Sequence, residues 1–561
     1  MDSTQQKCYV CGKESSRKCS QCKEIFYCGE QHQKIDWKRH KFDCAFVYVT
    51  DPNMGRCLIA KRDLNPGDVI LMEAPIAFGP RPHLVEEGPV PCVGCCRLIM
   101  AEKSPRCEGC DWPVCHNDCV GLKDPNKHGH ECFILRLRTH KALDGLHEYY
   151  RQDALFALRC LMVQRKGIKK WMQFLSMESH MEKRGVGTEI YKEYDDRVIN
   201  YLEENFLKPL KRLEQDSKEP IFPDMSRETL HKICGIIDVN GLEVNQGAEV
   251  MGLYPIACSM EHNCIPNTIH SFEDEFANYR ITMRAALPIK KGERITTMYT
   301  HSLWGTQARR EHLKETKYFS CACERCKDPT EMGTYLSALR CLGSETKPCG
   351  GNQLPLNPLD DKTEWACDKC EIKIGNIQAS YLINQIGDDV DQVQLSNPTV
   401  RELDNLLSKL LTFLHPNHYH CFSVKHSLVQ LFGYQQGYLP NQISDDQLKR
   451  KAKMCRDMLD ITSKIDPGNS RLCLYTGVLL HELHLADVIY VKRKWDIGNK
   501  KELLELLKEA DESLAKAKEV LKYEIKTMSG EKLHNLMDSS RKEFIRWTQR
   551  NKIDLNKEIV E

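Results

Sequence analysis

The sequence lacks the features of a membrane or nucleic-acid-binding protein. It has no run of about 18 apolar residues, the length that a spanning helix needs, and no apolar stretch follows Met1. Lysine plus arginine (80) almost equals aspartate plus glutamate (79), so a net charge of +1 gives no reason to expect attraction to phosphates. We therefore expect a soluble intracellular protein.

Cysteine is abundant, with 29 residues in 561. In a chain without a secretory signal, closely spaced cysteines indicate metal binding more often than disulfides. Of the 29 cysteines, 21 fall into CxxC-type clusters. The others have mostly apolar neighbours and are expected to be ordinary buried thiols: Cys57, Cys96, Cys160, Cys234, Cys258, Cys421, Cys455 and Cys473.

The first cluster supplies eight potential ligands within residues 8–44. Eight ligands suffice for two tetrahedral zinc ions. So short a segment cannot be stabilised by burial alone, so metal binding would supply its folding energy. The ligands are Cys8, Cys11, Cys19, Cys22, Cys28, His32, His40 and Cys44.

The second cluster, in residues 92–132, is less regular but also fits two zinc ions. It ends in a His-x3-Cys pair, as the first cluster does, and His130 is an alternative to His128. The predicted ligands are Cys92, Cys95, Cys107, Cys110, Cys115, Cys119, His128 and Cys132.

Two further thiolate sets are predicted. Cys264 is isolated but could complete a tetrahedral zinc site with a later cluster, Cys321, Cys323 and Cys326. A second set suits a small zinc ribbon, although two pairs of unliganded thiols are an alternative: Cys341, Cys349, Cys367 and Cys370.

Hydrophobic patterning divides the rest of the chain. Residues 55–71 hold two apolar runs separated by Pro66-Gly67, which predicts strand, turn and strand. Residues 135–232 show helical periodicity, and a β-rich region is expected to resume near residues 235–240. From residue 380 onward, leucines between Leu403 and Leu414 form one helical face, and further helices are expected to residue 525.

Three motifs in one order resemble the catalytic end of SET-domain lysine methyltransferases. They are the segment Glu261–Asn267, the pair Gly292-Glu293 with Tyr299, and the Cys-x-Cys-x2-Cys cluster at 321–326. The first cysteine cluster, with Tyr27 before Cys28 and Trp37 after it, resembles a MYND finger. A zinc module inserted into a SET domain is typical of the SET-and-MYND (SMYD) family, and the additional finger and ribbon are most like its insect branch.

The resemblance implies a multidomain α+β fold. A MYND finger (1–46) would precede the first part of the SET domain (47–90), a second MYND-like module (91–133) and a helical insert (134–234). The SET core (235–304), a post-SET zinc segment (305–330) and a ribbon-like segment (331–379) would follow. An α-helical TPR-like array would occupy 380–561, although no strict 34-residue repeat is present.

MYND fingers are cross-braced, so the resemblance also implies a ligand pairing. One zinc would be bound by Cys8, Cys11, Cys28 and His32, and the other by Cys19, Cys22, His40 and Cys44. His32 stands where the family usually has cysteine, but imidazole is also a good zinc ligand.

Tyr299 is the catalytic tyrosine that the resemblance implies, with an ordinary strand tyrosine as the alternative. Zinc would be structural, and S-adenosylmethionine would supply the methyl group. The implied cofactor-binding residues are Gly55, Arg56, Glu178, Asn240, Glu261, His262 and Phe319.

Four positions depart from the family pattern. Glu261 replaces an asparagine and could pair with the cofactor's ammonium or sulfonium, or repel its carboxylate. Cys57 replaces a glycine, and His180 an asparagine. Lys317 stands where the family has a channel tyrosine, and a cation facing a substrate lysine would be unfavourable.

Two functions are therefore weighed. The first is a protein-lysine methyltransferase for histone or non-histone lysines, with a role in transcriptional regulation. The alternative is a catalytically inactive adaptor that binds proline-containing peptides through its MYND finger, and other proteins through its C-terminal helices. Sequence-specific DNA binding is not expected, because the ββα spacing of C2H2 fingers is absent. We expect a monomer in the nucleus, the cytoplasm or both.

Overall fold

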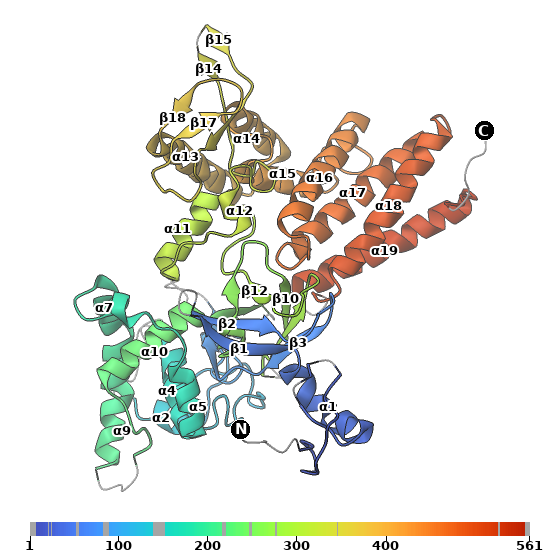
Figure 1. The fold of residues 1–561 in the computed structure, drawn as a ribbon. Helices are drawn as coiled ribbons and strands as arrows, with labels where there is room; N and C mark the ends of the chain where they lie inside the picture. The colour runs from blue at the N-terminus through green and yellow to red at the C-terminus, as the bar shows by residue number, and fades with distance from the viewer. Residues whose placement is uncertain are drawn as a thin grey trace. The chain divides into compact units, whose positions relative to one another are not determined.

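A computed structural model describes residues 7–555, apart from 21, 24, 52–54, 82–88, 139–151, 216–219, 246–248, 275–277, 345 and 525–527. The chain divides into two compact units, and Figure 1 labels many of their helices and strands. The first unit comprises residues up to 261 and 270–295, and the second comprises 262–269 and 296–561. Among the described residues, no helix is both long and apolar enough to cross a membrane.

The N-terminal finger has little regular structure apart from one helix, α1 (Glu30–Asp43). Two isolated bridges, between Lys7 and Glu14 and between Lys18 and Phe26, hold its loops together. Tyr27 is buried, and its hydroxyl donates to Asp36 at 2.6 Å, which ties the loop before α1 to the helix.

Three small sheets form the β-rich part of the region that resembles a SET domain. The first has the order β1-β2-β12-β9, with β1 at Phe46–Asp51, β2 at Gly55–Ala60, β12 at Arg294–Thr297 and β9 at Glu261–His262. The second orders β10 (Thr268–Phe272), β11 (Ile281–Ala285) and β3 (Val69–Glu73). The third orders β4 (Ala77–Pro80), β8 (Glu249–Leu253) and β7 (Leu242–Asn245).

The predicted strand-turn-strand pattern of residues 55–71 is confirmed. Strands β2 and β3 flank a turn in which Gly67 has a φ of +93°, a conformation that favours glycine. Leu58 and Ile70 are fully buried in the same apolar cluster as Ile281. The two strands therefore belong to different sheets but share one core.

The helical character predicted for residues 135–232 is confirmed where the structure describes them, and residues 139–151 lie outside the described part. Leu155, Leu158 and Leu161 are buried on α4 (Gln152–Leu161). The other helices are α2 (Cys132–Leu135), α5 (Ile168–Leu175), α6 (Met181–Arg184), α7 (Glu189–Tyr194), α8 (Asn200–Leu202) and α9 (Lys208–Leu213). Two short strands, β5 (Val90–Pro91) and β6 (Leu98–Ile99), pair in the second zinc module.

The expectation that β structure resumes near residues 235–240 is wrong. These residues end helix α10 (Arg227–Asn240), and the next strand, β7, begins at Leu242. Ile233, Ile236 and Ile237 have helical spacing and are all buried. Burial of one helical face therefore outweighs the strand preference of the isoleucines.

In the second unit, α11 (Thr306–Thr316) and α12 (Glu324–Lys327) precede a ribbon-like sheet. This sheet has the order β13-β16-β17-β18, from β13 (Leu339–Arg340), β16 (Asn352–Pro355), β17 (Trp365–Cys367) and β18 (Lys373–Ile374). A separate hairpin pairs β14 (Gly343–Ser344) with β15 (Lys347–Pro348).

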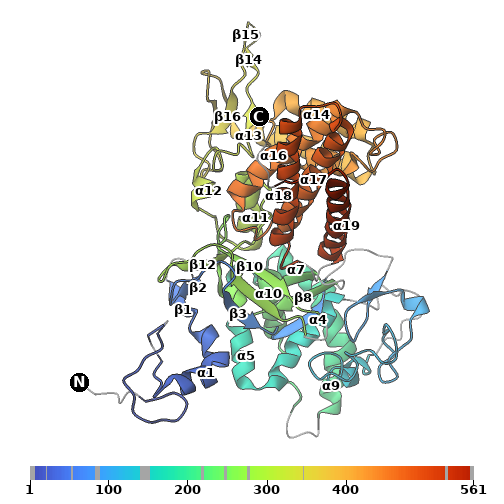
Figure 2. The same ribbon diagram turned by 90° about the vertical axis from the view of Figure 1, so that its right-hand side faces the viewer.

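In the described residues from 376 onward, seven helices complete the second unit, and Figure 2 shows α16, α17 and α18 side by side. Thr399 and Ser444 begin α14 and α16 with capping boxes. Leu403, Leu407 and Leu410 of α14 are buried, as the leucine periodicity predicts. The helices are α13 (Asn376–Leu395), α14 (Val400–Phe413), α15 (Tyr419–Leu431), α16 (Asp445–Ile465), α17 (Cys473–Lys494), α18 (Lys500–Val520) and α19 (Met528–Arg550).

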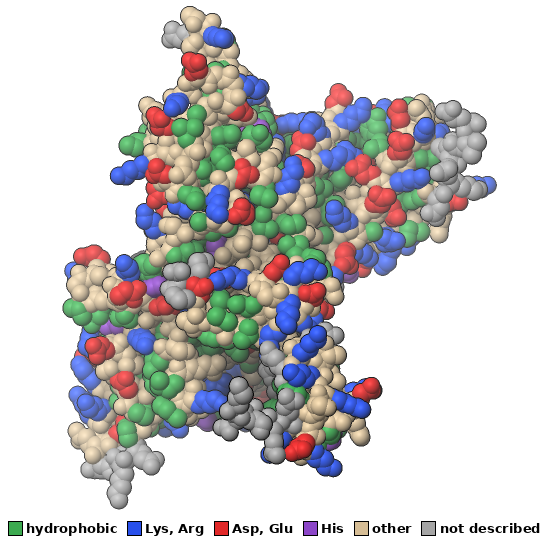
Figure 3. Space-filling view, in the orientation of Figure 1, with side chains coloured by type: hydrophobic (Ala, Val, Ile, Leu, Met, Phe, Trp, Pro, Cys, Tyr) green, Lys and Arg blue, Asp and Glu red, His purple; other side chains and the backbone are tan. Residues whose placement is uncertain are grey.

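The multidomain α+β fold expected from the sequence is confirmed, with a β-rich SET region and a helical C-terminal part. On the face drawn in Figure 3, basic and acidic side chains are interspersed, in keeping with the net charge of +1.

Candidate functional site

The first finger gathers its eight predicted ligands into two sets of four. Within each set, the ligand atoms lie within 4.8 Å of one another. Helix α1 carries His32 in its first turn and His40 in its last, so one helix serves both sets. The His32 Nδ1 atom lies 3.0 Å from Cys28 Sγ, and His40 Nε2 lies 3.5 Å from Cys22 Sγ. The grouping matches the cross-braced pairing that the resemblance implied.

The second module forms two more sets. One is all-thiol, and the other includes His128 rather than the alternative His130, which is exposed. The imidazole is oriented by its surroundings: Nε2 lies 3.3 Å from Cys107 Sγ, and Nδ1 lies 3.3 Å from Glu131 Oε1. The sets are Cys92, Cys95, Cys115 and Cys119, and Cys107, Cys110, His128 and Cys132.

Glu131 connects this module to the helical insert. Its two carboxylate oxygens accept hydrogen bonds of 2.7 and 2.9 Å from Arg159 of α4. Burial by itself would raise the pKa of the Glu131 carboxyl. The positive charge and hydrogen bonds of Arg159 lower this pKa by more, so it lies below its ordinary value. A carboxylate behind a histidine ligand fixes the ring's orientation and tautomer. Neither Glu131 nor Arg159 was predicted, because their relation to His128 exists only in three dimensions.

The fifth set unites distant parts of the sequence. Cys264 Sγ lies 3.5 Å from Cys326 Sγ and 4.0 Å from Cys321 Sγ, and Cys323 belongs to the same group. In the ribbon, Cys341 lies 3.6 Å from Cys370, and Cys349 lies 3.7 Å from Cys367. Cys341 also interacts with Cys349 and Cys367, so both sets bring their predicted members together.

The donor sets fit zinc in composition and geometry. They consist of thiols and imidazoles in groups of four, the combination found in structural zinc sites. All 29 cysteines are free of disulfides, and of the eight predicted ordinary thiols, seven are buried and Cys258 is half-buried.

His262, Tyr299 and Phe319 form a group of aromatic rings, and His262 Nε2 lies 3.3 Å from Cys264 Sγ. Ring centroids are 5.4 Å apart for His262 and Tyr299, 6.0 Å for His262 and Phe319, and 6.4 Å for Tyr299 and Phe319. Tyr299 follows β12, after the turn at Gly292, whose φ is +89°. Such a ring group can line a narrow apolar passage.

The cofactor-binding residues predicted in the first unit are held by local hydrogen bonds. Asn240 Nδ2 donates to the backbone oxygen of Glu178 at 2.7 Å, which joins α10 to the loop after α5. Arg56 Nη1 donates to the backbone oxygen of Ser176, in the same loop, at 3.0 Å. Within the described part of the chain, a Cβ atom on Gly55 would meet nothing within 4 Å, so no described residue fills the space beside its backbone.

Glu261 has an unforeseen partner. Its Oε1 atom accepts a 2.6 Å hydrogen bond from Arg294, which also binds Asp51 at 2.7 Å. The Oε2 atom of Glu261 is buried and has no hydrogen-bond partner among the residues that the structure describes. A buried carboxylate oxygen of this kind can accept a hydrogen bond from a ligand.

The structure also shows the surroundings of the other three residues that depart from the family pattern, Cys57, His180 and Lys317. Cys57 is fully buried in β2. His180 has a left-handed backbone with φ of 48°, and its Nδ1 atom lies 3.1 Å from Glu182. Lys317 is the C-cap residue that follows α11, and burial together with the charge of Lys317 lowers the pKa of His312.

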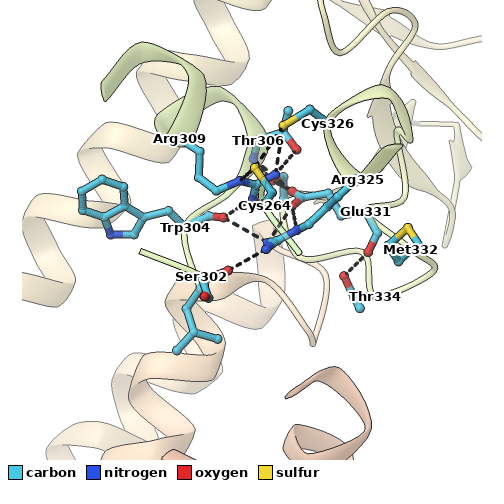
Figure 4. A network of polar contacts seen from close by, with 12 residues as sticks. Cys264, Ser302, Trp304, Thr306, Arg309, Arg325, Cys326, Glu331, Met332 and Thr334 are labelled. Atoms are coloured by element: carbon cyan, nitrogen blue, oxygen red, sulfur yellow. Dashed lines mark hydrogen bonds and ion pairs between the residues drawn. The ribbon is translucent and has the colours of Figure 1, made fainter. Parts of the chain in front are cut away.

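Sequence reasoning also missed a buried charge network beside Cys264 (Figure 4). Glu331 Oε2 accepts from Arg309 at 2.7 Å and from Arg325 at 3.0 and 3.1 Å. Arg325 lies between Cys323 and Cys326, which was the only sequence signal of this network.

Comparison with known proteins bears on this arrangement. Residues 8–44 match the MYND finger family, and residues 55–300 match the SET domain family. The chain is 31% identical over 326 residues to "SET domain-containing protein SmydA-8, isoform A" of Drosophila melanogaster, covering 56% of this chain and 63% of that protein. It is 23% identical over 491 residues to "Histone-lysine N-methyltransferase ASHR1" of Arabidopsis thaliana, covering 84% and 90%. The human "N-lysine methyltransferase SMYD2" is 20% identical over 317 residues, covering 56% and 48%.

The chain thus spans under two thirds of the SmydA-8 proteins, namely 63% of isoform A and 65% of isoform B. The SET domain of LSMT bound to lysine and AdoHcy, a solved structure, has 12% identity and a TM-score of 0.27, too low to support an argument.

These matches and the thiol sets define a zinc-binding protein with a SET domain. A MYND finger precedes that domain, the combination that the sequence resemblance to the SET-and-MYND (SMYD) family implied, and over part of its length the chain is similar to the insect SmydA-8 proteins.

Proposed function

We propose that the chain is a protein-lysine N-methyltransferase that uses S-adenosylmethionine, as the sequence resemblance implies. The observation that carries this proposal is the group of His262, Tyr299 and Phe319 beside the thiol set of Cys264, in a chain whose residues 55–300 match the SET domain. Relatives named as histone-lysine and N-lysine methyltransferases support it.

The residues present suit the cofactor. The unpartnered Oε2 atom of Glu261 is a ready acceptor for an ammonium group, and the open backbone at Gly55 leaves room for a ligand. When bound, S-adenosylmethionine supplies a methyl group on a sulfonium. The residues proposed to hold it are Gly55, Arg56, Glu178, Asn240, Glu261, His262 and Phe319.

The chain's own residues would align and desolvate the substrate. The hydroxyl oxygen of Tyr299 would accept a hydrogen bond from the lysine amine and orient its lone pair. Phe319, which is 37% exposed, would cover the lysine stem and exclude water, and an apolar surrounding favours the neutral amine. Zinc at the thiol sets would have a structural role only.

Calorimetric titration of S-adenosylmethionine into zinc-replete protein is the test. Micromolar binding, with loss of methyl transfer but retained binding in Tyr299→Phe, is the expected result. Absence of binding by folded protein would overturn the methyltransferase proposal. A lysine-containing protein in the nucleus or cytoplasm would be the substrate, and transcriptional regulation the setting.

An adaptor function is the alternative, and the ion pair between Arg294 and Glu261 favours it, because it already occupies one oxygen of a proposed cofactor residue. The finger could bind proline-containing peptides, since Tyr9, Ile35 and Trp37 are exposed there (57%, 61% and 37%). Peptide binding without cofactor binding would favour the adaptor function.

We further propose that the domains have the boundaries predicted from the sequence and that the protein is a monomer.

A further inference from the structure

Three buried charged side chains lie against the post-SET thiol set of Cys264, Cys321, Cys323 and Cys326. Arg309 and Arg325 are fully buried, and Glu331 is 1% exposed. Figure 4 shows Arg309 reaching from α11 toward Cys264, Cys326 and Glu331. Buried ions of this kind are stable only when each is compensated by an opposite charge or by hydrogen bonds.

The contacts of Arg309 divide between sulfur and oxygen. Its Nε atom donates to Cys264 Sγ at 3.3 Å and its Nη2 atom to Cys326 Sγ at 3.6 Å, while Nη1 donates to Glu331 at 2.7 Å. A guanidinium can do this because its donors lie in one rigid plane and point in several directions, whereas an ammonium is a single point.

The balance of charge explains why sulfur is contacted. Glu331 is shared by two guanidinium groups, so one positive charge in the network has no carboxylate of its own. A zinc ion bound by four thiolates keeps a net charge of about −2. The thiolates therefore provide the missing negative charge, and Arg309 reduces the repulsion among them.

A second chain of contacts leads from the same sulfur to the proposed active site. His262 Nε2 lies 3.3 Å from Cys264 Sγ, and its Nδ1 atom accepts a hydrogen bond from the backbone N–H of Tyr299 at 3.0 Å. We propose that Arg309 is a positioning residue of this site: it holds the thiolate of Cys264 and, through His262, the backbone at Tyr299. The catalytic meaning of this inference rests on the proposed function, whereas its zinc-binding part does not.

Zinc retention tests the first link. Full-length Arg309→Met and Arg309→Lys are compared with Arg310→Met for the rate at which zinc is lost to a chelator, and circular dichroism monitors folding. Arg310 is a matched control, since it is the next residue of α11, is 7% exposed, and donates to the backbone oxygens of Cys321 and Leu359 rather than to sulfur.

We expect one zinc equivalent to leave roughly tenfold faster or more in Arg309→Met, with a smaller effect in Arg309→Lys. Arg310→Met should release zinc at nearly the wild-type rate. Equal acceleration in both methionine variants, or none in either, would overturn the proposal. If the methionine variants do not fold, the rates of zinc loss from Arg309→Lys and Arg310→Lys are compared instead. Faster loss from Arg309→Lys alone supports the proposal, and equal rates overturn it.

The second link is tested with 3-fluorotyrosine placed at residue 299 and observed by 19F NMR. Its resonance should shift in Arg309→Lys and stay in place in Arg310→Lys. An unmoved resonance in both variants would refute the connection to Tyr299. Neither measurement uses S-adenosylmethionine, so failure of this inference is distinguishable from failure of the methyltransferase proposal.

Discussion

His262 joins Tyr299 to Cys264. Its Nδ1 atom accepts the backbone N–H of Tyr299 at 3.0 Å, while Nε2 lies 3.3 Å from the sulfur of Cys264. Because Nδ1 accepts, a neutral ring carries its proton on Nε2 and can donate it to the thiolate. One imidazole thus links the proposed catalytic tyrosine to a thiol of the proposed zinc site.

Replacing His262 with phenylalanine should separate its ring contacts from its hydrogen bonds. His262→Phe keeps an aromatic ring near Tyr299 and Phe319 but leaves the N–H of Tyr299 without its acceptor. We expect kcat to fall about tenfold or more, equivalent to about 1.4 kcal/mol, the scale of one lost hydrogen bond. Steady-state kinetics with measured zinc content test this, and an unchanged kcat at full zinc occupancy would contradict it.

Neutralising Glu261 should weaken cofactor binding. The unpartnered Oε2 atom would lose its charge in Glu261→Gln, and a charge-assisted hydrogen bond is worth about 1.5–3 kcal/mol. We therefore expect S-adenosylmethionine to bind about tenfold more weakly in calorimetry. Asp51→Asn is the matched control, since Asp51 contacts the same Arg294. Equal weakening in both variants would instead point to the ion pair.

Glu73 should make stability depend on pH. This residue ends β3, and burial raises the pKa of its carboxyl to about 7, although hydrogen bonds from the backbone N–H groups of Ala257 and Ile256 lower it in part. Because the folded pKa lies above the unfolded one, near 4.5, the folded state holds the proton more tightly. Its contribution is therefore most favourable at low pH and is lost as pH rises through about 7.

The test compares urea unfolding of the wild type and Glu73→Gln at pH values of about 5 and about 8. The wild type should lose about 2–3 kcal/mol relative to the variant over this interval. Comparison with the variant cancels effects of other titrating groups, including the thiols. Parallel pH profiles for the two proteins would show that Glu73 is not responsible.

Removing zinc should unfold the N-terminal finger. Among the described residues, the buried apolar cluster of the finger consists of Tyr27 and four proposed ligands, Cys8, Cys19, Cys22 and Cys44, with Ile25 packed against it, so this cluster depends on the metal ligands. After chelation, trypsin should cut first within residues 8–44, as mass spectrometry would show. Helices α16 and α17, packed through an ordinary apolar cluster, provide the internal comparison. Retained protection of the finger in metal-free protein would contradict this expectation.

Much of the molecule could be predicted from local sequence. Cysteines and histidines that can bind zinc follow regular spacings, so the members of each ligand set could be predicted. The leucine face of α14 follows a 3–4 periodicity. The family resemblance added the relation between Cys264 and residues 321–326, which spacing alone suggests only weakly. Residues 235–240 could not be predicted correctly, because an isoleucine-rich segment suits a strand or a buried helix face, and only its neighbours select between them.

The sequence by itself determined which cysteines and histidines could act as metal ligands, that the MYND finger precedes the SET domain, and that Tyr299 follows the Gly292-Glu293 turn, because these depend on residue identity and short-range spacing. The tertiary structure decided which charges meet. In the folded chain His128, and not His130, lies among the thiols of the second module. Glu261 pairs with Arg294, and Arg309 contacts Cys264 and Glu331. These partners are distant in sequence or lack a distinctive motif, and buried charges select one another only when folding has removed water from both.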